Sequence, residues 1–191
     1  MKMLYNQKKS IVFGFNLFLE HVLEYGFAHE KGRMTAPPRL QLGSGAWNIA
    51  KTLESLGVTS SNLRLIALSG KSTDLDTCAL RQLLKREKIV ATLFPVRKCA
   101  ANSYYLVPQR GEGFAFGYDG GDINATASLL RAIEMEGKRA SLKVVAEIGP
   151  SDTDLKFAEG LLRKYFPEQV SILIPSPALT KNKKLTKILP Y

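Results

Sequence analysis

The stretch GSGAWNIAKTLESLG, residues 43–57, indicates a tight turn that leads directly into a helix. Gly43 and Gly45 allow the backbone to approach a ligand closely, and a helix that begins just after them points unpaired N–H groups at that ligand. Aliphatic residues then recur at helical spacing, and a glycine ends the pattern (Ile49, Leu53, Leu56, Gly57). On the sequence alone, a plain strand-to-helix turn explains the two glycines equally well.

Apolar runs and helical patterns alternate on both sides of this stretch. Buried strands are predicted over residues 10–15, 63–69, 142–148 and 170–174. Helices are predicted over residues 74–88, 124–136 and 152–165, with Asn124 as one N-cap and Ser151 or Asp152 as another. This alternation predicts an α/β fold in which helices cover both faces of a mostly parallel sheet.

Two further regions indicate a small second sheet. Residues 19–42 mix aliphatic residues with glycine and proline, which is typical of exposed strands and loops. Residues 90–94, 103–107 and 113–118 are short, aromatic or β-branched runs separated by Pro95, Pro108 and Gly111. We expect these three runs to form a small antiparallel sheet inserted between the α/β units.

Composition narrows the class of protein. The 191 residues, 45% hydrophobic and 23% charged, predict one globular domain over residues 1–191, and no apolar run reaches the length of a membrane span. We expect a soluble, cytoplasmic protein. The formal net charge of +10 is spread along the chain, and the local run around Lys183 lacks aromatic residues, so a solvated face is favoured over nucleic-acid binding. Cys78, Cys99, His21 and His29 have no metal-binding spacing.

The order of elements and several strings resemble the ribokinase (PfkB) family of carbohydrate kinases over essentially the whole chain. The strings are Gly14 after the first strand, residues 43–57, and LRLIALSGKSTD, LLKREKI, YYLVPQRGEG and KVVAEIGP. The resemblance implies a three-layer α/β/α core with a small β lid, built from about residues 19–42 and 90–118, that closes over a sugar. Lids of this family often pair between subunits, so we expect a homodimer through the lid or an open sheet edge.

The resemblance also implies where a sugar or nucleoside binds. We expect the substrate-binding residues to be Asn16, Gly43, Ser44, Gly45 and Asn48. The amide of Asn48 can both donate and accept hydrogen bonds, as vicinal hydroxyls require. Three positions depart from the family pattern: Leu19 stands where an Asp holds sugar hydroxyls, Ser44 replaces the second glycine, and Ile174 replaces a polar residue. Since leucine cannot replace a carboxylate, sugar binding is expected to be weak or lost.

The family's catalytic Asp lies in a Gly-Ala-Gly-Asp motif near its C-terminus, beside the nucleotide pocket, and no such motif occurs here. The DGGD string at residues 119–122 matches a turn after the lid, so Asp122 is not expected to be catalytic. The chain resembles an N-terminal portion truncated before the nucleotide-binding part. We therefore predict no catalytic, cofactor or metal site, although the intact family uses ATP and Mg²⁺, and expect the chain alone to be inactive. The alternative is a degenerate kinase fold that serves as a non-catalytic protein-interaction module.

Overall fold

The large sheet of the protein is parallel throughout. The structure is a computed structural model that describes residues 9–22, 39–96, 103–107, 114–118, 123–149, 151–165 and 172–180. Five strands pair in the order β5-β4-β1-β8-β9, and every pair is parallel. They are β1 (Ser10–Gly14), β4 (Leu63–Ser69), β5 (Val90–Pro95), β8 (Leu142–Ile148) and β9 (Ile172–Pro175). The predicted α/β class with a mostly parallel sheet is confirmed.

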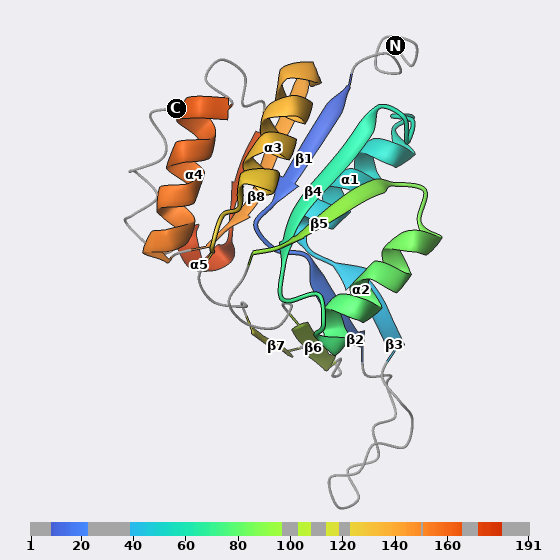
Figure 1. Ribbon diagram of the computed structural model, residues 1–191. Coiled ribbons are helices and arrows are strands. Elements are labelled where there is room, and N and C mark those ends of the chain that lie inside the picture. Colours follow the sequence, from blue (N-terminus) through green and yellow to red (C-terminus); the bar gives the residue numbers. More distant parts are fainter. Residues whose placement is uncertain are drawn as a thin grey trace, which may run out of the picture.

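Two layers of helices cover this sheet, because successive residues of its strands point to opposite faces. One buried cluster joins Val12, Leu65 and Val144 of the strands to α1 (Gly45–Ser55) and α2 (Leu75–Arg86). The other joins Phe13, Ile66 and Val145 to α3 (Ala127–Arg139) and α4 (Asp152–Tyr165), with the short α5 (Pro177–Thr180) beside them. The result is the three-layer α/β/α arrangement seen in Figure 1.

A smaller sheet of four strands lies beyond the carboxyl ends of the parallel strands (Figure 1). Its order is β3-β2-β6-β7, built from β3 (Arg39–Gly43), β2 (Phe18–Val22), β6 (Ser103–Val107) and β7 (Phe114–Tyr118). The β2/β3 and β6/β7 pairs are antiparallel, whereas β2 and β6 run parallel. We call this the lid sheet; it is mixed rather than purely antiparallel, because β2 and β6 are not consecutive in the chain.

The prediction was wrong for the segment that begins at Val90. Residues 90–94 were expected in the small sheet and in the lid region 90–118, but they form β5, which pairs in parallel with β4 along residues 64–69. The reason is the intervening helix α2: a strand, a helix and a second strand form a crossover unit whose strands pair in parallel in one sheet. Only β6 and β7 of that region belong to the lid sheet.

Helix boundaries depend on which side chain caps the first turn. For α3 the N-cap is Thr126, whose hydroxyl accepts the Leu129 N–H at 3.3 Å, and not the predicted Asn124. For α4 the predicted cap Ser151 is confirmed, since its hydroxyl accepts the Asp154 N–H at 3.0 Å. None of the described helices is long and apolar enough to cross a membrane.

Several predicted features lie outside the described residues. They are residues 23–38 of the first lid region, His29, Cys99, the 119–122 turn with Asp122, the start of the strand predicted at residue 170, and the basic run with the C-terminal residues 181–191.

Candidate functional site

The order of the parallel strands identifies one position at which a ligand can bind. From β1 the chain builds the sheet first toward β4 and β5, and then on the other side toward β8 and β9. In open α/β sheets, ligands bind outside the carboxyl ends of the strands at the point where this direction changes. Here the carboxyl ends of β1 and β8 lie next to each other, with Gly14 opposite Ala146. The lid sheet lies at this same end (Figure 1).

The N-terminus of α1 reaches this position through the turn at residues 43–45. Ser44 is the N-cap, and its hydroxyl accepts the Trp47 N–H at 3.1 Å. The Ser44 backbone has φ 127° and ψ 158°, a conformation that glycine adopts readily and other residues do not. Ser44 therefore combines a backbone conformation typical of glycine with a side chain that caps the helix.

Glu147, near the end of β8, links the parallel sheet to the N-terminus of α1 through a hydrogen bond. Its Oε1 accepts the backbone N–H of Gly45 at 2.6 Å, a short charge-assisted hydrogen bond at the positive end of the helix dipole. Its backbone is also unusual, with φ 61° in the left-handed region. Such strain is concentrated at functional sites. Glu147 was not predicted as a site residue, although a charged residue at the end of an apolar strand was a usable signal.

A second carboxylate lies on the other side of Ser44. Glu20 of β2 accepts a hydrogen bond from Gln41 Nε2 at 2.7 Å, and its carboxylate lies where a Cβ on Gly43 would be placed. Gly43 therefore allows the close approach of the Glu20 carboxylate, while the close approach of a ligand at this glycine stays a prediction. Leu19, at the position where an Asp was expected, is only 1% exposed and belongs to the cluster on the α1 side of the sheet. Glu20 was also missed, because the strand's facing could not be assigned from the sequence.

Of the other predicted site residues, Asn16 and Ser44 are buried, whereas Asn48 is exposed. Asn16, two residues after β1, is 6% exposed at the same carboxyl edge, and Ser44 is 5% exposed. Asn48 is exposed on α1, where its N–H donates to the Ser44 carbonyl and its carbonyl accepts the Thr52 hydroxyl. The geometry thus brings Gly43, Ser44 and Gly45 between two carboxylates, with Asn16 at the same edge and Asn48 on the outer side of the helix.

This arrangement can recognise hydroxyl groups. Carboxylate oxygens accept hydrogen bonds from hydroxyls, and the amide of Asn16 can donate and accept. The Gly45 and Trp47 N–H groups of α1 already donate to Glu147 and Ser44. The carboxylates of Glu20 and Glu147, which contact the turn at residues 43–45, disfavour an anionic group against this turn by like-charge repulsion. Within the described ranges, no group of three or more His, Cys, Asp and Glu side chains is placed to hold a metal ion.

The fold is that of the ribokinase-type sugar kinases. A possible 1-phosphofructokinase from Thermotoga maritima matches 90% of this chain with a TM-score of 0.66 at 16% identity, and the match covers 55% of that protein. A fructokinase from Xylella fastidiosa, solved with bound ATP, gives a TM-score of 0.65 at 12% identity over 89% of this chain and 52% of its own. Ribokinase from Giardia lamblia gives a TM-score of 0.60 at 15% identity, and the match covers 90% of this chain and 56% of that protein.

The chain therefore spans about half the length of these solved structures, and its likeness to them is one of fold. Neither the models of known protein families nor the curated proteins give a match to the sequence.

Proposed function

We propose that this chain forms the hydroxyl-recognising part of a PfkB-type carbohydrate kinase, a class of enzyme that transfers the γ-phosphoryl group of ATP to a sugar or nucleoside hydroxyl. The observation that supports this most directly is the contact between Glu147 and the Gly45 N–H at the switch point of the sheet, 2.6 Å long. It places a carboxylate, a helix N-terminus and a close-approach glycine at one position, beneath a lid sheet.

The charge of the site limits the part of the substrate that binds there. Glu20 and Glu147 flank the turn at residues 43–45, so a phosphate group bound against this turn would meet two negative charges. A neutral sugar or nucleoside face, by contrast, offers hydroxyl donors to the same oxygens. We infer that the substrate is held here through uncharged hydroxyls, and that the lid excludes water around them.

Phosphoryl transfer also needs a base for the attacked hydroxyl and cations or donors for the developing phosphate charge. In the proposed function these are supplied by residues other than the candidate site described above, together with ATP and Mg²⁺. The chain alone is then a binding unit without turnover.

Isothermal titration of the chain with a panel of neutral sugars and nucleosides tests this proposal. One member of the panel is expected to bind, and Glu147→Gln should weaken that binding at least about tenfold, because a hydrogen bond to a charged group contributes about 1.5–3 kcal/mol. Glu134→Gln, which removes an exposed carboxylate on α3, is the control. ATP-dependent phosphorylation by the purified chain would contradict the inactive state, and equal binding by both variants would contradict the assigned site.

A second candidate function, a non-catalytic interaction module, is favoured by one observation. Leu19 is 1% exposed at the position where the resemblance calls for a hydroxyl-binding Asp. A chain that binds no member of the sugar and nucleoside panel, yet melts cooperatively as a folded protein, would favour this second function over the first.

A further inference from the structure

The outer edge of β5 is unpaired in the part of the chain that the structure describes. β5 is the last strand of the sheet on its side, and its inner edge is paired with β4 from Val90 to Pro95. Such an edge presents a row of backbone N–H and C=O groups to which an extended segment of another chain can add as a new strand. Figure 1 shows β5 at the side of the sheet away from β8 and β9.

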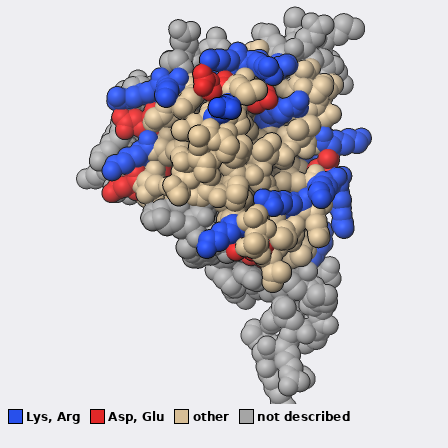
Figure 2. All heavy atoms as spheres, in the orientation of Figure 1, with Lys and Arg blue, Asp and Glu red and all other residues tan. Residues whose placement is uncertain are grey.

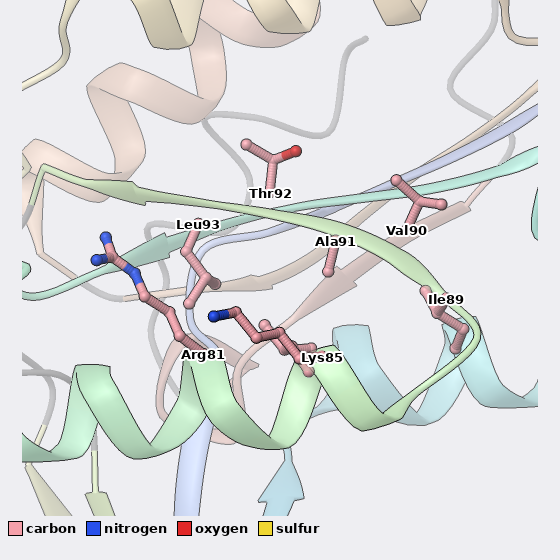
Figure 3. Close-up of a pocket in the computed structure, with 8 residues that line it drawn as sticks. Arg81, Lys85, Ile89, Val90, Ala91, Thr92 and Leu93 are labelled. Atoms are coloured by element: carbon pink, nitrogen blue, oxygen red, sulfur yellow. The ribbon is translucent and has the colours of Figure 1, made fainter.

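One face of this edge is a basic groove with an apolar floor. The groove lies between α2 and β5, has a volume of about 440 Å³, and is lined by Arg81, Leu84, Lys85 and the residues from Ile89 to Leu93. Figure 3 shows the Arg81 and Lys85 side chains on the same side of β5 as Ala91 and Leu93. No acidic residue lines the groove, and neither cation has an ion pair with a described residue.

The opposite face of the same edge is apolar and close to neutral. Val90 and Thr92 point away from α2 (Figure 3) and line a second groove of about 200 Å³ against α3. Val90 is 45% exposed and Met135 is 48% exposed, while the only charged residues in the lining are Arg64 and Glu136, of opposite sign. Figure 2 shows an uncharged area over β4 and β5, bordered by Lys and Arg side chains and, at its upper and left margins, by Asp and Glu side chains as well.

We propose that the β5 edge binds an extended peptide strand of a partner protein in which acidic and apolar residues alternate. Side chains of a strand alternate between the two faces of a sheet, so every second residue would lie on the α2 side beside Arg81 and Lys85. Glutamate suits these positions, because its methylenes can cover Ala91 and Leu93 while its carboxylate reaches the cations. The intervening residues would lie on the α3 side, where Val90 and Met135 favour apolar partners.

The same charges argue against a second copy of this chain as the occupant. When two β5 edges pair antiparallel around a two-fold axis, both α2 helices lie on one face of the joined sheet. The Arg81 and Lys85 side chains of both copies would then meet across the junction, and like charges so placed are destabilising. An acidic strand from a different protein removes this repulsion.

Fluorescence anisotropy with a labelled peptide that alternates Glu and Val over the six residues of β5 tests the proposal. The chain is expected to bind it, and the double variant Arg81→Glu/Lys85→Glu should bind at least about tenfold more weakly. A peptide with Lys in place of Glu should instead prefer this double variant, which shows that the variant is folded. Lys156→Glu/Lys164→Glu on α4, with the same change in net charge, is the matched control and should bind like the unaltered chain.

Two N-methylated forms of the peptide test strand addition itself. The N–H groups of the Glu residues point to one edge of the added strand and those of the Val residues to the other. Only the set that faces β5 forms hydrogen bonds with it, so one of the two methylated peptides should lose binding and the other should keep it. Equal binding of both methylated forms, or equal loss in the α4 control, would overturn the proposal in favour of general charge attraction. A dimer of the chain that the peptide dissociates would overturn it in favour of a second copy.

Discussion

Ser44 combines a helix cap with a backbone conformation suited to glycine. Substitution by alanine or by glycine removes the cap in both cases, but only glycine relieves the backbone strain. Ser44→Ala loses the hydroxyl that accepts the Trp47 N–H and keeps the strain at φ 127°, whereas Ser44→Gly loses the hydroxyl but relieves the strain. We expect the alanine variant to be less stable than the glycine variant by about 1–3 kcal/mol in urea denaturation. Equal unfolding free energies would contradict the strained conformation.

Gly14 allows α1 to pack directly on β1. A Cβ at this position would lie 2.6 Å from the Ala46 Cβ, closer than two carbon atoms can approach. Gly14→Ala should therefore lower the free energy of unfolding by about 1–3 kcal/mol. Gly160→Ala is the matched control, because that helical glycine has nothing within 4 Å of an added Cβ, and the change should stabilise by about 0.5–1 kcal/mol. Destabilisation by both changes would contradict the packing argument.

At the scale of the elements, the ammonium group of Lys51 links α1 to the end of α2. Lys51 Nζ lies 2.6 Å from Glu54 Oε2 and 3.2 Å from Glu87 Oε2, and the hydrogen bond to Glu54 is the main cause that raises the pKa of Lys51 above its ordinary 10.5. A raised pKa means that this stabilisation is present below pH 10.5 and is lost as the pH rises beyond the folded value. The pair is exposed, so Lys51→Met should cost less than about 1 kcal/mol at pH 7.

Urea midpoints at low and high salt measure that cost. The difference between the unaltered chain and Lys51→Met should shrink at high salt, because exposed ion pairs are screened. Lys88→Met, which removes an exposed lysine at the end of the same region, provides the reference and should be neutral at both salt concentrations. A loss that does not depend on salt would mean that the contact of Lys51 Nζ with the Trp47 ring, 5.8 Å from its centroid, matters more than the ion pairs.

Most elements could be predicted from the sequence because their patterns are local. The residue bounds of β4, β8 and α4 agree with those predicted, since long apolar runs and a serine cap leave little ambiguity. The partner of β5 was missed because a short apolar strand has the same local pattern in either sheet, although the helix predicted over residues 74–88 was a signal for parallel pairing with β4. Thr126 and Asn124 are both competent caps, and tertiary packing decides between them.

The candidate site was predictable only in part, because only some of its residues carry a local sequence signal. The turn at residues 43–45 carries a local glycine signal, whereas the roles of Glu20 and Glu147 depend on contacts across 23 and 102 positions of sequence, from Glu20 to Gly43 and from Gly45 to Glu147. No local pattern encodes which carboxylate meets which N–H. The strand facing that buries Leu19 and turns Glu20 toward Gly43 is likewise set by the pairing of β2 with β3.

At the scale of the whole molecule, the apolar side chains exposed on β9 and on the lid sheet predict self-association. Ile172 of β9 is 44% exposed at the other end of the parallel sheet, and Leu40 of the lid sheet is 41% exposed. Apolar side chains at such positions favour burial against another copy. We expect a homodimer in sedimentation velocity, and Leu40→Lys or Ile172→Lys should dissociate it, depending on which surface forms the interface. A monomer at all concentrations would contradict this prediction.

The central place of β1 has a consequence for synthesis on the ribosome. β1 emerges before both of its partners: β4 follows within about 60 residues, from Ser10 to Leu63, but β8 begins only at Leu142. A nascent chain that ends anywhere before β8 therefore leaves the middle strand of the future sheet open along one side, with Phe13 and Val12 uncovered by α4 or β8. The sheet can be completed only after the segment from Leu142 onward has been made, and until then the open edge of β1 is available for unwanted pairing.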